Sequence, residues 1–573
     1  MQYPTLLEYM KAIQDAGNNL DKLSHLSVVL DGHGEPYHIS GDSSVVFKMQ
    51  DKTTGKCYAL KCFTKAQKGC ADASSNSSSM KYLEKELLVL SQGKEEKYPV
   101  LLMDWVDDDS LGASQLKVED MSTEATKAEL NEAITDEFSV KYSKDGRKLL
   151  KVPQKLKGTY AIKEGTKIIC DRAFEDCKSL RSLVIPNSVT SIGESAFSFC
   201  SSLKSIVLPD GITSIGDETF FGCSSLASLV IPDGVTSIGN GAFAYCGSLK
   251  NLVLPKSVVS IKGNLFCKWN GEVKCLSPNF IFEDGVLFNK DKSTIISFRD
   301  KDITSYVIPD YVTSIGGDAF SGCESLTSLV ISDSVVSIGD GAFSHCESLK
   351  NIVLPNSITG IGFCVFQHCH SLNSLVIPDS VTSIDSLAFC YCESLTSIVI
   401  PDSVTCIGNR AFEYCFSLKS LVLSKSLTSI GDWAFNTAES LKSLVLSKSL
   451  TSIGDWAFNT AESLKSLVIP DSVTSIGDYA FSGCRSLKSL VISNSVTHIA
   501  VGAFLSCTSL SSVVIPDGVT SIGEGAFIGC ESLKSIVIPD GVVSIEKDAF
   551  RDCNFPNDFK QKLISRFGDK IFG

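Results

Sequence analysis

The cysteines and histidines are the residues of this sequence best suited to chemistry. The chain of 573 residues contains 22 Cys and seven His. Thirteen of the cysteines lie three residues after a recurring Phe: Cys177, Cys200, Cys223, Cys246, Cys323, Cys346, Cys369, Cys392, Cys415, Cys484, Cys507, Cys530 and Cys553. Ala438 and Ala461 occupy the same position in two further repeats. The position therefore favours a small buried side chain at a tight turn, and it does not require sulfur.

Four residues of metal-ligand types stand close together: Cys364, His368, Cys369 and His370. They lack the C-x₂-C spacing of a structural zinc site. Aromatic rings also recur at the position of His368 in neighbouring repeats: His345, His368, Tyr391 and Tyr414. We interpret these residues as an aromatic stripe, and we expect neither a metal nor a cofactor.

A period of 23 residues organises most of the chain. The recurring Phe stands at 174, 197, 220, 243 and 266, then at 320, 343, 366, 389, 412, 435, 458, 481, 504, 527 and 550. Apolar residues between them follow the pattern L-x-x-L-x-I-x-x-x-V-x-x-I: Leu464, Leu467, Ile469, Val473 and Ile476. One unit cannot bury these residues alone, so the units must stack as coils of a solenoid, with parallel strands about 4.8 Å apart. Units 423–445 and 446–468 are identical, which indicates recent duplication.

The residue pattern of the unit is LxIPxSVxxIGxxAFxxCxSL. Over roughly Phe138 to Cys553, the chain resembles the BspA-like leucine-rich repeat family, whose units have this pattern. The resemblance and the period predict a β-rich (α/β), right-handed leucine-rich-repeat solenoid of about 16 coils with parallel strands. Members of this family occur in bacteria and some protists, often as surface proteins that bind host proteins or other cells. The resemblance therefore implies protein binding.

The two arrays of repeats begin and end with segments of a different kind. Residues 140–152 and 285–298 each predict a β-hairpin, with turns near Gly146 and Lys292. Each hairpin precedes its first repeat by the same distance, so both are expected to cap the start of an array. At the C-terminus, apolar residues four apart predict a capping helix with one buried face: Phe559, Leu563, Phe567 and Ile571.

Residues 41–106 have alternating strand patterns and resemble the small lobe of a protein kinase. In this resemblance Gly41 belongs to the phosphate loop, Lys61 is the strand-three lysine, and Met103–Val106 form the hinge. Residues 81–90 supply either an acidic partner for Lys61 or the next strand. The sequence contains no H-R-D or D-F-G motif, so we expect no enzyme activity. Gly41 and Lys61 remain candidates for residual nucleotide binding.

The sequence predicts six parts. They are a degenerate kinase-like α+β domain (1–110), an acidic linker with a short helix (111–137), a first repeat array with its hairpin cap (138–267), a hairpin insertion (268–312), a second array (313–553) and a C-terminal capping helix (554–573).

The outward positions of the repeated strands are the candidate partner-binding surface. If side chains alternate along each strand, the Val between the buried Leu and Ile points outward. Such valines include Val184, Val207, Val230, Val330, Val376, Val399, Val468 and Val537. A basic stripe runs beside them: Arg181, Lys204, Lys250, Lys350, Lys419, Lys442, Lys465, Lys488 and Lys534. A continuous apolar stripe is typical of a contact surface, although Val also suits a strand intrinsically.

Composition limits the partners and the location. The formal charge of −13 disfavours nucleic acid, and the short apolar runs disfavour membrane insertion. The first residues predict a short amphipathic helix rather than an export signal, so we expect a cytoplasmic protein with reduced thiols, unless a non-classical route exports it.

We predict a non-enzymatic scaffold that binds a protein partner. The alternatives are a pseudokinase-like regulatory protein and a cell-surface adhesin, and the oligomeric state stays open.

Overall fold

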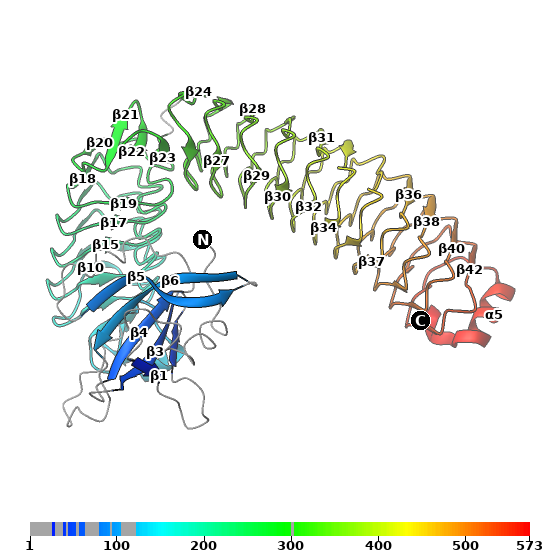
Figure 1. Ribbon diagram of the computed structural model, residues 1–573, viewed down its shortest axis with the longest axis horizontal. Helices are drawn as coiled ribbons and strands as arrows, with labels where there is room; N and C mark the ends of the chain where they lie inside the picture. The colour runs from blue at the N-terminus through cyan, green and yellow to red at the C-terminus, as the bar shows by residue number, and fades with distance from the viewer. Residues whose placement is uncertain are drawn as a thin grey trace. The chain divides into compact units, whose positions relative to one another are not determined.

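The computed structural model describes residues 26–28, 38–41, 44–52, 57–63, 80–91, 94–104, 122–299 and 303–573 (Figure 1). The chain divides into two compact units, Met1–Asp120 and Met121–Gly573, and each is described by itself. The six predicted parts are a finer division than these two units, and their boundaries stay predictions. Among the described residues, no helix has the length and apolar character needed to cross a membrane.

The described part of the first unit is an antiparallel sheet. Its strands are β1 (Leu26–Val28), β2 (His38–Gly41), β3 (Ser44–Asp51), β4 (Cys57–Phe63), β5 (Met80–Ser91) and β6 (Lys94–Asp104). Their order is β1-β3-β4-β6-β5, with β2 paired to β3. Alternate residues of β3 and β4 are buried: Phe47, Met49, Leu60 and Cys62. Residues 81–90 form strand β5 and not a helix, while the amphipathic helix predicted at the start of the chain lies outside the described residues.

The second unit is a solenoid of about 17 turns with little helix, which confirms the predicted fold class. Its strand β10 (Gly158–Ala161) pairs in parallel with β12 (Leu180–Val184) of the next coil.

Most coils contribute two short strands. Strands that carry the outward Val, here called the Val strands, are β12, β14 (Ser205–Val207), β16 (Ser228–Val230), β18 (Asn251–Leu254), β24 (Ser305–Val307), β26 (Ser328–Val330), β28 (Asn351–Val353), β31 (Ser397–Val399), β33 (Ser420–Val422), β36 (Ser466–Val468), β38 (Ser489–Val491), β40 (Ser512–Val514) and β42 (Ser535–Val537). Strands that end in a buried or half-buried Ile, the Ile strands, are β13 (Ser191–Ile192), β15 (Ser214–Ile215), β17 (Ser237–Ile238), β19 (Ser260–Ile261), β25 (Ser314–Ile315), β27 (Ser337–Ile338), β29 (Gly360–Ile361), β30 (Ser383–Ile384), β32 (Cys406–Ile407), β34 (Ser429–Ile430), β35 (Ser452–Ile453), β37 (Ser475–Ile476), β39 (His498–Ile499), β41 (Ser521–Ile522) and β43 (Ser544–Ile545).

Pairing between neighbouring coils follows the sequence period. Ser466 of β36 pairs with Ser489 of β38, and Ser452 of β35 pairs with Ser475 of β37, in both cases in parallel. In the second array of Figure 1, the Val strands and the Ile strands lie along opposite sides of the solenoid. Each coil therefore offers two separate strand faces to solvent.

The recurring Phe forms the centre of the core. These side chains are fully buried, and the centroids of contacting rings in successive coils lie between 5.0 Å (Phe412–Phe435) and 6.0 Å (Phe220–Phe243) apart. Stacking of this kind contributes roughly 0.5–1.5 kcal/mol per pair beyond the burial of area. The period is strict because each ring needs a partner in the coil on either side.

A polar ladder runs along the turn after the Ile strands. Asp432 Oδ1 accepts the backbone N–H of Asp455 at 2.9 Å, and Asp455 Oδ1 accepts that of Asp478 at 2.8 Å. The glycine before each acidic residue leaves room for the carboxylate of the preceding coil, since a Cβ on Gly454 would lie 2.5 Å from Asp432 Oδ1. The recurring Ile-Gly-Asp sequence therefore joins coils through side-chain hydrogen bonds.

Both arrays begin with the same sheet topology, as the two predicted hairpins require. In the first array, antiparallel strands β7 (Ile134–Thr135), β8 (Lys141–Tyr142) and β9 (Lys148–Lys151) lead into parallel strands β11 (Ile168–Ile169) and β13. In the second, β21 (Phe280–Glu283), β22 (Val286–Asn289) and β23 (Thr294–Phe298) lead into β25 and β27, after β20 (Glu272–Cys275) has closed the first array against β18.

Strand β22 separates two hydrophobic cores. Leu287 packs into the core of the first array, whereas Val286 and Phe288 pack into the core of the second. Because side chains alternate across a strand, one short segment supplies the last layer of one core and the first layer of the next.

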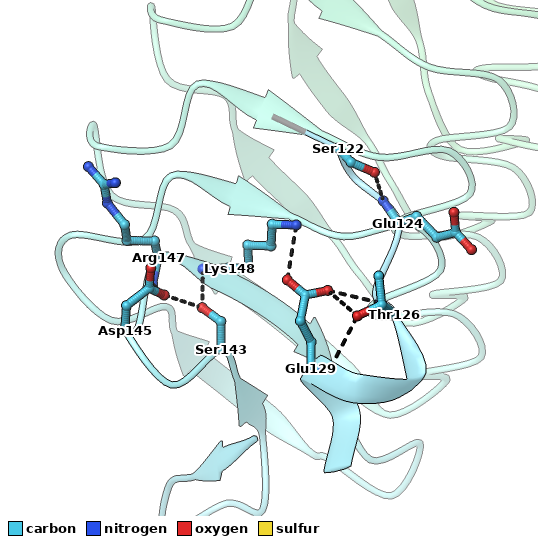
Figure 2. Close-up of polar contacts among 8 residues, drawn as sticks. All are labelled: Ser122, Glu124, Thr126, Glu129, Ser143, Asp145, Arg147 and Lys148. Atoms are coloured by element: carbon cyan, nitrogen blue, oxygen red, sulfur yellow. Dashed lines mark hydrogen bonds and ion pairs between the residues drawn. The ribbon is translucent and has the colours of Figure 1, made fainter. Parts of the chain in front are cut away.

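Helix α4 (Lys127–Glu132) covers the first sheet and completes the starting cap (Figure 2). Thr126 and Glu129 form a capping box, in which Glu129 Oε2 accepts the Thr126 backbone N–H at 2.9 Å. The other oxygen, Glu129 Oε1, pairs with Lys148 Nζ at 3.0 Å. Lys148 is buried, with its side chain 8% exposed, so Glu129 neutralises a charge that solvent barely reaches.

The far end of the solenoid is closed by helix α5 (Asn557–Phe567) and the 3-10 helix η2 (Asp569–Phe572). Leu563 and Ile571 are buried against the last coils. The predicted helix is confirmed, but its extension to Ile571 was wrong. The chain leaves α5 at Gly568, where φ is 87°, and Ile571 reaches the core from η2.

Substitution of Glu129 by Gln is expected to destabilise the first coils by about 2 kcal/mol, because the buried ammonium of Lys148 loses the carboxylate that pairs with it at 3.0 Å. Hydrogen exchange of the amides of β9 and β11 measures this local loss. The matched control is Glu124→Gln, which removes an exposed carboxylate nearby (Figure 2). Equal exchange in the two variants would contradict the role given to the ion pair.

Candidate binding surfaces

The predicted valines all point into solvent. Their exposed fractions run from 43% at Val330 to 81% at Val376, while the Leu or Ile before each of them is buried. Further valines of the same column, which the sequence analysis did not name, are also exposed: Val253, Val307, Val353, Val422, Val445, Val491 and Val514. The 23-residue period alone would have found them. We call the exposed valines of this column the Val stripe. The alternation is observed, whereas the binding role of the Val stripe stays a prediction.

The basic residues beside the Val stripe are exposed as well. Among the described residues, none of Lys204, Lys350, Lys419 and Lys488 forms an ion pair. An open cavity of about 680 Å³ lies along this stripe where the first array ends, between Lys204, Lys250 and Glu272. The stripe therefore gives one edge of the Val surface a positive charge.

The aromatic stripe that the sequence predicts is present. Ring centroids lie 4.4 Å apart between His345 and His368, between His368 and Tyr391, and between Tyr391 and Tyr414. The interplanar angles are 14°, 12° and 22°. In the described residues, no group of His, Cys, Asp and Glu is arranged to hold a metal ion. The histidines thus contact one another through ring faces.

A second aromatic row follows in the next coils and was missed by the sequence analysis. Trp433 and Trp456 lie 6.3 Å apart, and Trp456 and Tyr479 lie 4.2 Å apart, both nearly parallel. Arg410 precedes Trp433 in this column, with its guanidinium carbon 4.8 Å from the ring centroid. These rings also recur every 23 residues in the sequence. They stand two residues before the recurring Phe, whereas the rings of the first row stand two residues after it. We call the two rows together the aromatic strip: His345, His368, Tyr391, Tyr414, Trp433, Trp456 and Tyr479.

Burial lowers the pKa of both stacked histidines. Burial, with His345 and His370 close by, lowers the pKa of His368 to about 4. Burial also lowers the pKa of His345, although Glu347 and Glu324 oppose this. The imidazoles therefore stay neutral at pH 7, which permits close ring contact.

The free energy of unfolding is expected to fall as the pH drops from about 6.5 toward 4, because the unfolded chain binds a proton at His368 that the folded chain excludes. His368→Tyr, which extends the tyrosines already present in the column, should flatten this pH dependence. Thermal melts between pH 4 and 7 measure both slopes. Parallel slopes for the wild type and the variant would contradict the assignment.

The cysteine ladder is buried, as predicted, but its thiols also make a recurrent hydrogen bond. Cys200 Sγ donates to the Phe174 carbonyl at 3.1 Å and Cys392 Sγ to that of Phe366 at 3.2 Å, each in the preceding coil. Burial raises the pKa of Cys246 and of Cys553 to about 12. Among the cysteines whose side chains the structure describes, none forms a disulfide. The ladder is therefore a packing feature of unreactive thiols.

Alkylation with iodoacetamide at pH 8 is expected to modify Cys406 before the ladder cysteines, because it is exposed whereas the ladder thiols are buried. Peptide mapping should show at least about tenfold faster modification of Cys406 than of Cys392, since only the thiolate reacts. Cys406→Ser is the control that removes the early product. Early modification of ladder cysteines in the folded chain would contradict their burial.

The nucleotide-binding candidates stay predictions. Gly41 ends β2, and Lys61 lies within β4, where it pairs with Val46 of β3 and Leu101 of β6. The side chain of Lys61 lies outside the described residues. The described residues therefore give no side-chain geometry for a phosphate site.

The repeats match a known family. The description "BspA type Leucine rich repeat region" applies to six segments, residues 158–271, 295–415, 361–484, 405–520, 437–555 and 498–573, which together cover more than half of the chain. These segments begin at residue 158 and give no support to the kinase-like small lobe. The matched family is defined by its repeats, and it is not a catalytic family.

Several solved structures are similar to parts of this chain. A leucine-rich repeat protein from Eubacterium ventriosum is 28% identical, with a TM-score of 0.45, over 53% of this chain and 82% of that one. One from Bacteroides ovatus is 25% identical, with a TM-score of 0.39, over 77% and 96%. A leucine-rich cell surface protein from Faecalibacterium prausnitzii is 24% identical, with a TM-score of 0.33, over 76% and 98%.

No curated protein sequence matches the chain. Classification therefore depends on the repeated segments, which share one residue pattern and one coil geometry. The chain belongs to the BspA-type leucine-rich repeat family.

Proposed function

We propose that the solenoid is a non-enzymatic scaffold that binds a protein partner through the Val stripe and its flanking lysines. The observation that carries this proposal is the Val column itself, which leaves a large apolar side chain exposed on successive coils. Proteins rarely expose contiguous apolar surface of this extent without a partner. The candidate contact residues are Val184, Val207, Val230, Val330, Val376, Val399, Val468, Val537, Lys204, Lys350, Lys419 and Lys488.

The composition of the face indicates how a partner would be held. The valines offer apolar area, and the exposed lysines beside them favour an acidic rim on the partner. Because consecutive coils present nearly the same residues, binding energy would accumulate along the stripe. A partner with its own repeated or extended surface suits such a face best.

The location of the protein stays a prediction. A cytoplasmic scaffold and a cell-surface adhesin would use the same stripe, and the Faecalibacterium prausnitzii relative is described as a cell surface protein. Protease treatment of intact cells separates the two settings. Digestion of the chain on intact cells favours the adhesin, and complete protection favours the cytoplasmic scaffold.

Replacement of Val376, Val399 and Val422 by Glu is expected to abolish partner capture, because three charges interrupt the apolar stripe in adjacent coils. Pull-down from the native source followed by mass spectrometry compares wild type and variant. The matched control places Glu at Thr382, Thr405 and Thr428, which are exposed on the Ile-strand side of the solenoid. Melting temperatures should stay within a few degrees for both. Equal capture by the two variants would reject the Val stripe.

A further inference from the structure

The lysines beside the Val stripe are distributed unevenly along the solenoid. Four of them stand in consecutive coils, and we call them the lysine row: Lys419, Lys442, Lys465 and Lys488. In the other coils of the second array, this position holds Thr, Ser or Asn, or a lysine with uncharged neighbours in the column: Thr304, Thr327, Lys350, Asn373, Thr396, Ser511 and Lys534. The coils therefore accept small neutral residues at this position, and packing does not require the lysine row.

The lysine row repeats at the spacing of the coils. In these four coils, the centroids of successive buried Phe rings lie 5.0 Å, 5.1 Å and 5.4 Å apart. Each lysine stands seven residues after the Phe of its coil, so the lysines advance along the solenoid by the same steps. At one end of the row, the backbone N–H of Lys488 donates to the carbonyl of Lys465 at 2.9 Å.

The charge of the lysine row is not neutralised by any described residue. All four side chains are exposed, and none forms an ion pair in the part of the chain that the structure describes. The nearby carboxylate of Glu462 pairs instead with Arg485 at 3.5 Å. Like charges opposite one another on neighbouring strands repel. An anionic partner relieves this repulsion and gains up to four charge contacts.

Four exposed valines of the Val stripe run parallel to the lysine row: Val422, Val445, Val468 and Val491. Their exposed fractions lie between 51% at Val422 and 81% at Val445. Each follows its lysine by three residues, which corresponds to roughly 10 Å of extended backbone. The partner segment that suits this surface therefore has an anionic stripe and an apolar stripe side by side.

An α-helix laid along the solenoid axis matches the surface in pitch and in width. Its pitch is about 5.4 Å, so it advances by one turn for each coil step of 5.0–5.4 Å. Its width of about 10–12 Å with side chains spans both columns. An extended strand instead repeats its same-face side chains about every 6.6 Å and loses register within four coils.

We infer that the lysine row and the four valines beside it bind an acidic amphipathic helix of the partner protein. The inference rests on the proposed function, because it uses the same face of the solenoid. Glu or Asp residues three or four apart pair with the lysines, and an apolar stripe of the same spacing packs on the valines. Lys442 and Lys465 belong to the two identical units, so the duplication lengthened this site by one coil.

The test uses the full chain and three fluorescein-labelled peptides of about 18 residues, long enough to span the row as a helix. The first has adjacent Glu and Leu stripes at helical spacing, the second has the same composition in scrambled order, and the third has Lys in place of Glu. Fluorescence anisotropy should show saturable binding of the first peptide that weakens with salt. The scrambled peptide should bind at least about fivefold more weakly, and the Lys peptide should not bind.

The variant Lys442→Thr/Lys465→Thr should bind the ordered acidic peptide about fivefold more weakly, because it removes two charge contacts of modest strength. The matched control is Lys350→Thr/Lys534→Thr, which removes the same charge from the same column outside the row and should bind as the wild type does. Thr396 already occupies this position in the coil before the row, so the coils accept the substitution.

The variant Val445→Thr/Val468→Thr tests the apolar half of the site. It keeps the shape of the side chains but reduces their apolar area, and it should also weaken binding of the ordered acidic peptide. Melting curves of every variant confirm that the solenoid is folded.

The inference is overturned if the ordered acidic peptide does not bind, or if the lysine-row variant and its control bind it equally. Equal binding of the ordered and scrambled peptides would also overturn it, since this result identifies general attraction for anions. Partner capture that persists in the lysine-row variant but is lost on Val→Glu substitution would reject the helix and keep the proposed function. Capture that is unaffected by Val→Glu would reject the proposed function, whatever the peptides show.

Discussion

The structure depends on the fact that one coil cannot bury its own apolar side chains. A 23-residue turn is too thin to enclose Phe435 or its equivalents, so each ring is covered by the rings of the coils before and after it. Everything else in the solenoid serves this contact. The parallel strands set the spacing, the Ile-Gly-Asp turns join neighbours through carboxylates, and the two ends need special segments because their last rings have no further neighbour.

Most of this architecture could be predicted from the sequence, because coils that stack on one another need the same residue types at the same positions of each unit, and this need produces the period. The columns of Phe, Cys and outward Val follow from counting in steps of 23, and the two hairpins follow from their equal distance to the first repeat. The aromatic stripe from His345 to Tyr414 was found in the same way. The prediction failed where the contact is not repeated. The break at Gly568 depends on a local left-handed turn, and the pairing of Lys148 with Glu129 joins two non-repeated elements.

The surfaces show the same division between repeated and unrepeated features. The Val stripe is nearly uniform and follows from strand alternation, so the sequence indicates its geometry but not its partner. The row from Trp433 to Tyr479 occupies only three coils, and its relation to Arg410 and Glu413 required coordinates. The coils share one backbone geometry but differ in the side chains at their turns. These turn residues can therefore give individual coils different binding properties.

The identical units 423–445 and 446–468 have a consequence for how such a chain changes over generations. Since the two identical units present the same residues to their neighbours, loss or gain of one such unit leaves the ladders of rings and carboxylates unbroken. Recombination between identical stretches would therefore lengthen or shorten the array in steps of about 4.8 Å without disturbing either cap. Coils can be gained or lost on either side of strand β22 but not across it, since the two faces of this strand pack into different cores. Length is thus a heritable variable in this fold, adjustable in whole coils within each array.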